Sequence, residues 1–191
     1  PGLLAGRLER APDGVFIERK THLGGGWTPV TTRGFHDHVT AVAALCAVHP
    51  APIHLHPLDA AWCFSPRNNL PGFYDAPETP ACPRVPVAEG TALELAGARW
   101  SVVDTPGHTP GGICWKLDGD RALFTGDTLF AGSCGRPDFA GGSMEVELQS
   151  LAKIAALPGD YEVYPGHMDC STLETERRFN PYLTALQNRG Q

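Results

Sequence analysis

Four segments of the chain place an aspartate or a histidine directly after a strand-like run, in a turn assisted by glycine. They are FHDHV with Asp37 and His38, DTPGHTPGG with His108, LFTGDTLF with Asp127, and VYPGHMD with His167. Side chains at the ends of neighbouring strands meet at one edge of a sheet, so we expect these residues to share a pocket although they are far apart in the sequence. The pattern therefore demands a sheet whose strand ends converge.

These side chains are of the types that bind a transition metal. Neutral imidazole and carboxylate together suit Zn²⁺, Fe or Mn, and a catalytic metal needs protein ligands plus an open position for water. Glycine beside a ligand fits a tight turn that brings the backbone close to the metal. Each residue alone would be an ordinary turn residue, so the prediction of a metal site rests on the four segments together.

Hydrophobic spacing predicts strands alternating with helices. Helices are predicted at 3–11, at 37–49 with Asp37 as N-cap and about three turns, at 143–157, and at 171–186 with a break near Pro181. Strands are predicted at 52–56, 92–104, 111–117, 121–127 and 161–166. Tight turns at Ala96-Gly97 and Asp118-Gly119 predict that residues 92–127 form an antiparallel meander. A long surface loop is predicted before it, at 64–86. This order describes a mixed α/β layer protein.

Length and composition bound the class of partner. The chain has 191 residues, 42% of them hydrophobic and 19% charged, with a formal net charge of -6. We expect one globular domain, residues 1–191, that acts on a small molecule and not on nucleic acid or a membrane. With no apolar run of bilayer length and no secretion signal, the expected location is cytoplasmic. The six cysteines form no C-x-x-C pair, which favours reduced packing thiols.

Longer motifs carry a resemblance to a known family. DTPGHTPGGICW, LFTGDTLFAGSCGRPDFAGG, VYPGH and ERRFNPYL resemble segments of the metallo-β-lactamase-fold hydrolases and, within them, of the glyoxalase II-like (hydroxyacylglutathione hydrolase-like) thioesterases. The likeness covers residues 36–183. It implies an α+β fold, a four-layer αββα sandwich, with a metal site at one edge of two facing sheets.

The resemblance also implies roles for individual residues. His108 would bind a first metal, Asp127 would bridge two metals, and Asp37, His38 and His167 would complete the second. The cofactor would be zinc, one or two ions, with iron or manganese as alternatives. A hydroxide held between the metals and oriented by Asp37 would attack a thioester carbonyl, since metal binding lowers the pKa of water toward neutrality. The implied enzyme is a metallo-hydrolase of the thioesterase type.

The first motif of that family, T-H-x-H-x-D-H, is incomplete in TTRGFHDH. Thr32 matches the threonine, but Arg33 and Phe35 stand where the first two histidines belong. A guanidinium offers no lone pair and a phenyl ring has no donor atom, while the charge of Arg33 would oppose a dication. His36 is a further candidate ligand, but it lies one residue before Asp37 and not two, so it would need a changed loop.

Three explanations of this departure stay open. The chain could be a single-metal enzyme that uses the four surviving second-metal ligands. It could be a non-catalytic pseudoenzyme that keeps the fold as a binding module. Residues 1–35 could also be an altered or truncated reading, because the likeness ends there and Pro1 stands in place of an initiator Met. A T-H-x-H-x-D-H in a neighbouring DNA frame upstream of Val39 would support that reading.

Loss of the first strands would have a physical consequence. One sheet would expose an unpaired edge and part of its apolar face. Such a surface favours instability or association of copies into a homo-oligomer.

A persulfide dioxygenase-like mononuclear iron enzyme is the nearest alternative within the superfamily. GSCGRPDF resembles the corresponding segment of those enzymes, although their iron is held by one of the histidines missing here. True glyoxalase II carries a C-terminal helical domain that helps to bind glutathione, and this chain stops soon after NPYL, which argues against a glutathione substrate.

Two further side chains in the glycine-rich GSCGR segment could take part in chemistry. Cys134 beside Arg136 could be a nucleophile, since a neighbouring cation lowers the pKa of a thiol. Arg136 itself could bind an anionic substrate or be an ordinary surface residue. Arg177 and Arg178 are predicted to be solvated helix charges.

The remaining histidines have a weaker claim. His54 and His56 alternate along a predicted strand, where a structural role or pocket lining is expected in preference to metal binding. His22 lies in a stretch, 15–30, without sustained periodicity.

Overall fold

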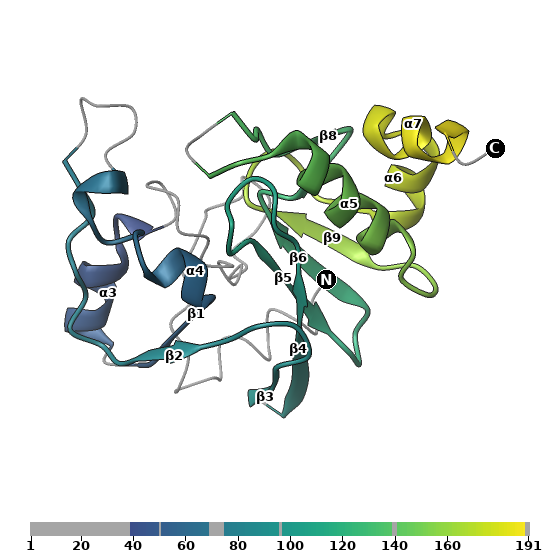
Figure 1. Ribbon diagram of the computed structural model, residues 1–191. Helices are drawn as coiled ribbons and strands as arrows, with labels where there is room; N and C mark the ends of the chain where they lie inside the picture. The colour runs from purple at the N-terminus through teal and green to yellow at the C-terminus, as the bar shows by residue number, and fades with distance from the viewer. Residues whose placement is uncertain (1–38, 50, 69–74, 96, 139–140, 190–191) are drawn as a thin grey trace.

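A six-stranded sheet forms the centre of the computed structural model, which describes residues 39–49, 51–68, 75–95, 97–138 and 141–189 (Figure 1). The strands lie in the order β10-β9-β6-β5-β4-β3. Their bounds are β3 (Ala92–Leu95), β4 (Ala98–Asp104), β5 (Ile113–Leu117), β6 (Ala122–Gly126), β9 (Glu162–Pro165) and β10 (Ser171–Thr172). Two small pairs accompany this sheet, parallel β1 (Ile53–Leu55) with β2 (Arg84–Pro86) and antiparallel β7 (Leu129–Phe130) with β8 (Ser133–Cys134).

The antiparallel meander predicted over residues 92–127 is confirmed. Strand β3 pairs antiparallel with β4, β4 with β5, and β5 with β6. Gly97, in the first turn, has a φ of 71°, which a residue without Cβ adopts at little steric cost. The Asp118-Gly119 segment turns the chain from β5 into β6.

Strand β9 enters the same sheet parallel to β6, which the sequence pattern did not predict. The connection passes through helix α5 (Met144–Ala155), whose first turn is capped by the Ser143 side chain. Parallel neighbours need such a crossover, whereas antiparallel ones need only a tight turn. Because Gly126 pairs with Pro165, the residues that follow β6 and β9 emerge at one edge of the sheet.

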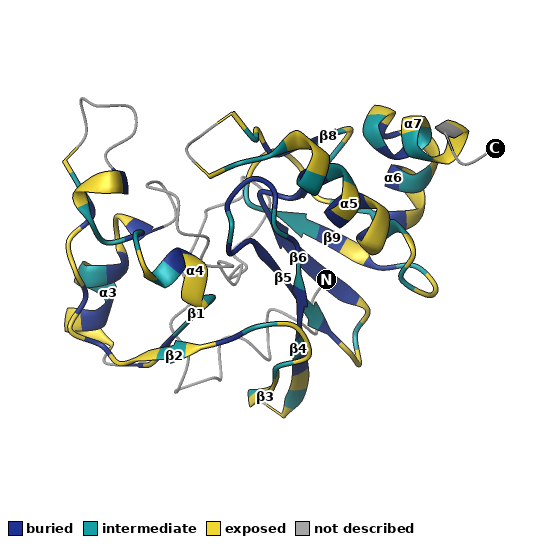
Figure 2. Cartoon of the chain, in the orientation of Figure 1, coloured by how far each residue is buried: buried dark blue, intermediate teal, exposed yellow. Residues whose placement is uncertain are grey.

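The central strands are buried on both faces (Figure 2). In β6, Leu123 packs into one hydrophobic cluster while its neighbours Ala122 and Phe124 pack into another. Successive side chains of a strand point to opposite faces, so both faces of the sheet are covered. This explains why Ala122, Leu123 and Phe124 form an apolar run without alternation.

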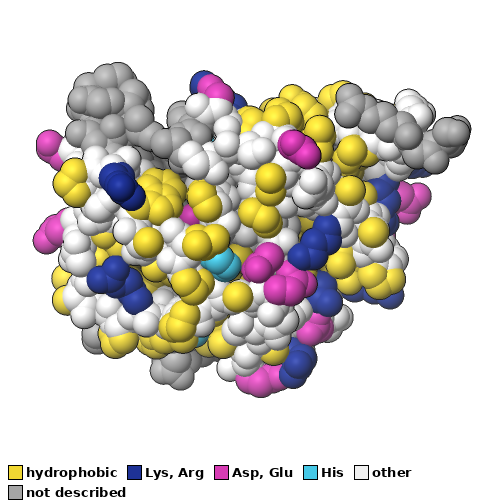
Figure 3. All heavy atoms as spheres, in the orientation of Figure 1, with side chains coloured by type: hydrophobic (Ala, Val, Ile, Leu, Met, Phe, Trp, Pro, Cys, Tyr) yellow, Lys and Arg dark blue, Asp and Glu magenta, His cyan; other side chains and the backbone are white. Residues whose placement is uncertain are grey.

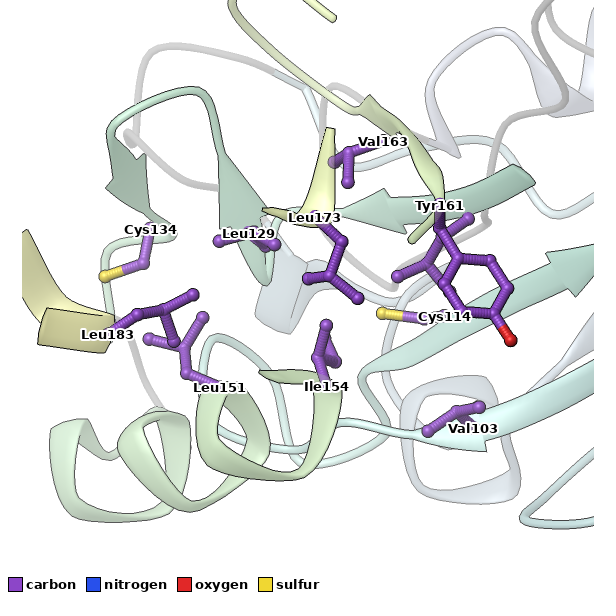
Figure 4. Packing of buried hydrophobic residues seen from close by; sticks show 11 residues of the cluster. Val103, Cys114, Leu129, Cys134, Leu151, Ile154, Tyr161, Val163, Leu173 and Leu183 are labelled. Atoms are coloured by element: carbon purple, nitrogen blue, oxygen red, sulfur yellow. The ribbon is translucent and has the colours of Figure 1, made fainter. Parts of the chain in front are cut away.

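Three helices cover one face of the sheet, namely α5, α6 (Leu173–Phe179) and α7 (Pro181–Arg189) (Figure 1). Leu151, Ile154 and Leu183 from this layer pack with Cys114 and Val163 of the sheet (Figure 4). The predicted break of the last helix is confirmed, since α6 ends before Pro181 and α7 begins at it. Proline is tolerated at the first helical position because the N–H that it lacks would have no partner within the helix.

Arg177 is not the solvated charge that the sequence predicts. Its guanidinium donates to the carbonyl oxygens of Ala155 (2.8 Å) and Gly159 (2.7 Å), and also to that of Leu157. A cation at this place satisfies the carbonyl of Ala155 in the last turn of α5 and two carbonyls of the segment that follows the helix. The prediction was wrong because the pattern of α6 alone does not show which helix end lies beside it. Arg178 is exposed, as predicted.

The first described elements form a smaller unit around the β1–β2 pair. They are α3 (Val42–Val48), α4 (Pro57–Ala60) and the short 3₁₀ helix η1 (Pro66–Asn68). Within the described residues, the helix predicted over 37–49 is confirmed from Val42 to Val48, with Ala41 at its N-cap and no side-chain capping bond. The predicted N-cap Asp37 and the predicted helix at 3–11 lie outside the described residues. Strand β1 is confirmed, whereas α4, η1 and β2 were not predicted.

The surface charge and the helices of the described residues can be compared with what a nucleic acid or a membrane requires. Acidic and basic side chains are interspersed over the face shown in Figure 3, which has no broad patch of one sign. None of the helices in the described part of the chain combines the length and apolarity that crossing a bilayer requires.

Candidate metal centre

His108 lies on the loop that joins β4 to β5. The base of the loop is closed by a hydrogen bond from the Thr105 N–H to the Gly112 carbonyl oxygen (2.7 Å). Gly107 has a φ of 143°, and a Cβ atom there would lie 2.3 Å from Oε2 of Glu147. A glycine is therefore required for this turn, which buries His108 to 4% exposure.

The orientation of the His108 ring is fixed by the backbone. Its Nδ1 lies 2.7 Å from the carbonyl oxygen of Arg136. Because a carbonyl oxygen accepts and never donates, Nδ1 carries a proton, and in the neutral ring Nε2 keeps its lone pair. Metal-binding histidines usually donate their other nitrogen in this way. Nε2 lies 3.4 Å from Oδ2 of Asp127.

Asp127 and His167 follow two adjacent parallel strands. Asp127 comes directly after β6 and is 2% exposed. His167 comes after β9, where the Gly166 N–H bonds the Gly126 carbonyl oxygen (2.7 Å) and so ties the two strand ends together. Nε2 of His167 lies 3.7 Å from Oδ1 of Asp127, so each carboxylate oxygen faces one imidazole. The structure thus brings three predicted site residues together, while their role as ligands stays a prediction.

The donor chemistry at this point fits a cation. The lone pair on His108 Nε2 faces a carboxylate oxygen at 3.4 Å, and two acceptors repel each other unless a proton or a metal ion lies between them. Within the described residues alone, no group of three or more His, Cys, Asp and Glu side chains is close enough together to hold a metal ion. Several residues of the predicted site lie outside the described residues, namely Arg33, Phe35, His36, Asp37 and His38.

Two fully buried carboxylates flank the His108 loop, and sequence reasoning missed both. Glu147 of α5 accepts the His108 N–H (2.7 Å). Asp59 of α4 accepts from the Thr109 hydroxyl (2.7 Å) and the Gly111 N–H (2.8 Å). The sequence gives little signal for either, because an acidic residue on a helix usually marks a solvated face.

Comparison with known families identifies the family of the chain. The model of the metallo-beta-lactamase superfamily matches residues 36–167, a span that contains the aspartates and histidines singled out in the four strand-end segments. The chain belongs to the metallo-beta-lactamase superfamily. The resemblance seen in its motifs is confirmed, and the mixed sheet with its helices is the α+β sandwich of that superfamily.

Several relatives in this superfamily are similar over most of the chain. A protein of Aquifex aeolicus is 37% identical over 164 residues, 83% of this chain and 76% of that protein. The probable metallo-hydrolase YqgX of Bacillus subtilis is 30% identical, over 84% of this chain and 79% of its own length. The hydroxyacylglutathione hydrolase of Rhizobium meliloti is 36% identical over 74% of this chain, which spans 49% of that enzyme. These names indicate hydrolase chemistry in general.

Solved structures share the fold, and one of them is a metal-bound form. The B3 metallo-beta-lactamase BLEG-1 superposes with a TM-score of 0.71 at 33% identity, covering 80% of this chain and 74% of that one. TTHA1623, solved in a di-iron-bound form, has a TM-score of 0.71 at 34% identity, covering 82% and 79%. ETHE1 from Myxococcus xanthus has a TM-score of 0.61 at 26% identity, covering 84% and 68%. Members of the superfamily bind metal ions, and the choice of zinc for this chain stays a prediction.

His54 and His56 make structural contacts within this metallo-beta-lactamase fold. The His54 ring meets Trp115 edge-on at 6.4 Å, and burial lowers the pKa of His54. His56 accepts the Leu58 N–H (3.2 Å) at the start of α4, and its Nε2 lies 3.9 Å from Oδ2 of Asp104. These contacts are those of the structural role expected for both histidines.

The nucleophile hypothesis for Cys134 is contradicted by the structure. The side chain is 7% exposed, and burial raises the pKa of the Cys134 thiol to about 11, so little thiolate exists at neutral pH. Arg136 does not lower it, because its exposed guanidinium pairs with both carboxylate oxygens of Asp138 at 3.0 and 2.6 Å. The prediction that Arg136 binds substrate remains untested.

Met168, next to His167, has a backbone conformation that disfavours a side chain. Its φ is 69°, and its side chain is 57% exposed, so burial gives little compensation. We expect Met168→Gly to raise the free energy of unfolding by about 0.5–1 kcal/mol, because relief of the left-handed strain exceeds the entropy that glycine loses on folding. Urea unfolding of the metal-free protein measures this change. Met168→Ala keeps Cβ and serves as control, and equal stability of both variants would argue against strain.

Proposed function

We propose that this chain is a metal-dependent hydrolase that cleaves small-molecule thioesters. The observation that carries the proposal is Asp127, whose two oxygens lie 3.4 and 3.7 Å from the Nε2 atoms of His108 and His167. A carboxylate shared in this way is suited to hold one metal ion or to bridge two. The relative named hydroxyacylglutathione hydrolase supports a thioester as the bond that is cleaved.

The metal would be held by His108, Asp127 and His167, together with the predicted ligands Asp37 and His38. When bound, it would lower the pKa of a water molecule and polarise the substrate carbonyl. The chain prepares this chemistry in two ways. The Arg136 carbonyl keeps the proton of His108 on Nδ1, and the burial of Asp127 reduces the screening of its charge by water.

The two histidines differ in their access to solvent. The side chain of His108 is 5% exposed, whereas that of His167 is 46% exposed. A substrate therefore approaches from the His167 side, while the His108 loop forms the closed wall. The chain spans 49% of the hydroxyacylglutathione hydrolase relative, and the substrate class we propose is small acyl thioesters.

Two measurements on the unaltered chain test this function together, namely its metal content and its hydrolysis of a thioester. We expect about one metal ion per chain and slow hydrolysis of a small acyl thioester, followed as release of its thiol. A chelator should abolish hydrolysis, and added Zn²⁺, Fe²⁺ or Mn²⁺ should restore it. Hydrolysis that survives chelation contradicts the proposal. Oxygen uptake with glutathione persulfide would support the dioxygenase alternative. Metal binding without thioester hydrolysis would support the alternative of a non-catalytic pseudoenzyme.

A further inference from the structure

We infer that Asp59 and Glu147 form a two-sided clamp that holds His108 in its ligand orientation before any metal arrives. The inference rests on the proposed function in one respect, namely that His108 is a metal ligand. Neither carboxylate belongs to the predicted ligand set. Both act through the backbone and hydroxyl groups of the His108 loop, so they are positioning residues.

Helix α5 holds the loop from one side. Glu147 accepts the His108 N–H at 2.7 Å, and the Ser143 N–H bonds the Gly107 carbonyl oxygen at 2.8 Å. The Ser150 hydroxyl donates to the Pro106 carbonyl oxygen at 2.6 Å. A Cβ on Gly107 would come within 2.4 Å of the Glu147 Cα, so helix and loop backbones are in direct contact. Three successive loop residues are thereby fixed to one rigid helix.

Helix α4 holds the loop from the other side. The two oxygens of Asp59 accept separately, Oδ2 from the Thr109 hydroxyl (2.7 Å) and Oδ1 from the Gly111 N–H (2.8 Å). A Cβ on Gly111 would lie 2.7 Å from the carboxyl carbon of Asp59, so a side chain at Gly111 would clash with Asp59. Asp59 thus binds the loop just after His108, at Thr109 and Gly111.

The free-energy cost of burying Asp59 and Glu147 indicates that these carboxylates do more than fill space. Burying a carboxylate costs free energy that a well-packed apolar side chain would not, and here two are buried at 0% exposure against one loop. A ligand already ordered by its surroundings loses less conformational entropy when it binds. This matters more here because Arg33 and Phe35 replace two histidines of the first metal site, which leaves His108 with fewer partner ligands.

Zinc affinity separates the clamp from simple structural support. We expect Asp59→Ala and Glu147→Ala each to weaken Zn²⁺ binding by about 10- to 100-fold, the usual effect of losing a group that orients a ligand. Competition with a chromophoric chelator measures the affinity with Zn²⁺ alone as the probe. Glu147→Gln and Asp59→Asn should stay close to the wild type. An amide oxygen still accepts an N–H, and the Thr109 hydroxyl can accept from the asparagine amide.

Glu176→Ala is the matched control. Glu176 is also a buried carboxylate, and it accepts the Gly132 N–H (2.8 Å) and the Asn180 amide (2.9 Å) on α6, away from the His108 loop. This variant should lower the melting temperature and leave Zn²⁺ affinity unchanged. If the Asp59 and Glu147 alanine variants lose no more affinity than Glu176→Ala, the clamp is wrong.

The metal-free protein provides a readout that needs no metal. We expect the His108 amide proton to exchange slowly in the wild type and faster in Glu147→Ala, and unchanged exchange would overturn the clamp. Should the alanine variants not fold, Thr109→Val removes the hydroxyl bond to Asp59 at constant shape and should weaken Zn²⁺ binding. If the wild type takes up no metal at all, the proposed function fails, while amide exchange still decides the clamp.

Discussion

Asp127→Asn is expected to remove metal binding and to lower kcat/KM for a small thioester by at least about 10²–10³-fold, the order seen when one preorganised group that stabilises developing charge is lost. Asparagine keeps the shape of the side chain but removes the negative charge that lies between His108 and His167. It also places an N–H₂ group where one imidazole now faces an oxygen. Metal content per chain and thiol release measure the two losses.

Thermal unfolding shows whether Asp127→Asn acts through the metal or through the fold. A ligand that binds the folded state raises the melting temperature in proportion to the logarithm of its concentration over Kd. Wild type should therefore be stabilised by added Zn²⁺ and the variant should not. Asp118→Asn, in the β5–β6 turn where Asp118 pairs with Lys116 at 3.1 Å, is the control and should retain the Zn²⁺ shift. A normal Zn²⁺ shift in Asp127→Asn would disprove the role assigned to Asp127.

The double change Arg33→His/Phe35→His is expected to raise the metal content from about one ion per chain toward two and to increase thioester hydrolysis by about 10²-fold. The change restores the T-H-x-H-x-D-H motif and replaces a cation and a phenyl ring with two lone-pair donors. A second metal would stabilise the charge that develops on the carbonyl oxygen. Metal analysis and kcat/KM on the same thioester provide the comparison.

Arg33→Gln/Phe35→Leu is the matched control for the restored motif. It removes the positive charge and the aromatic ring without supplying imidazoles, so it should gain little metal and little activity. Equal gains in both double variants would mean that relief of repulsion, and not ligation, limits the site. Two metals and full activity in the unaltered chain would contradict the account of Arg33 and Phe35.

Local chemistry made part of the fold predictable. Gly97 and the Asp118-Gly119 turn are short-range signals, and the meander from β3 to β6 follows from them. The parallel pairing of β6 with β9 depends on α5 crossing the sheet, and no local pattern records which strand a distant strand will join. The helix predicted at 37–49 is interrupted by a turn at Thr40 and Ala41, which apolar spacing does not show because it marks a face and not an end.

Some residues of the site were likewise predictable from the sequence and others were not. His108, Asp127 and His167 were predictable because turn chemistry at strand ends is written in adjacent residues. Asp59 and Glu147 were not, because the burial of a charged side chain is decided by what packs against it. Cys134 shows the same limit, since a neighbouring Arg136 suggested a reactive thiol while burial by other elements raises its pKa.

The crossover through α5 also orders events during synthesis of the chain. The meander up to β6 consists of contacts between sequence neighbours and can form while the rest is still on the ribosome, since local contacts form fastest. His167 reaches Asp127 only after α5 has packed and β9 has paired with β6. A nascent chain therefore presents Asp127 without its partner histidine until the native topology is complete. A metal ion held by both residues, as proposed, would therefore bind after this topology has formed.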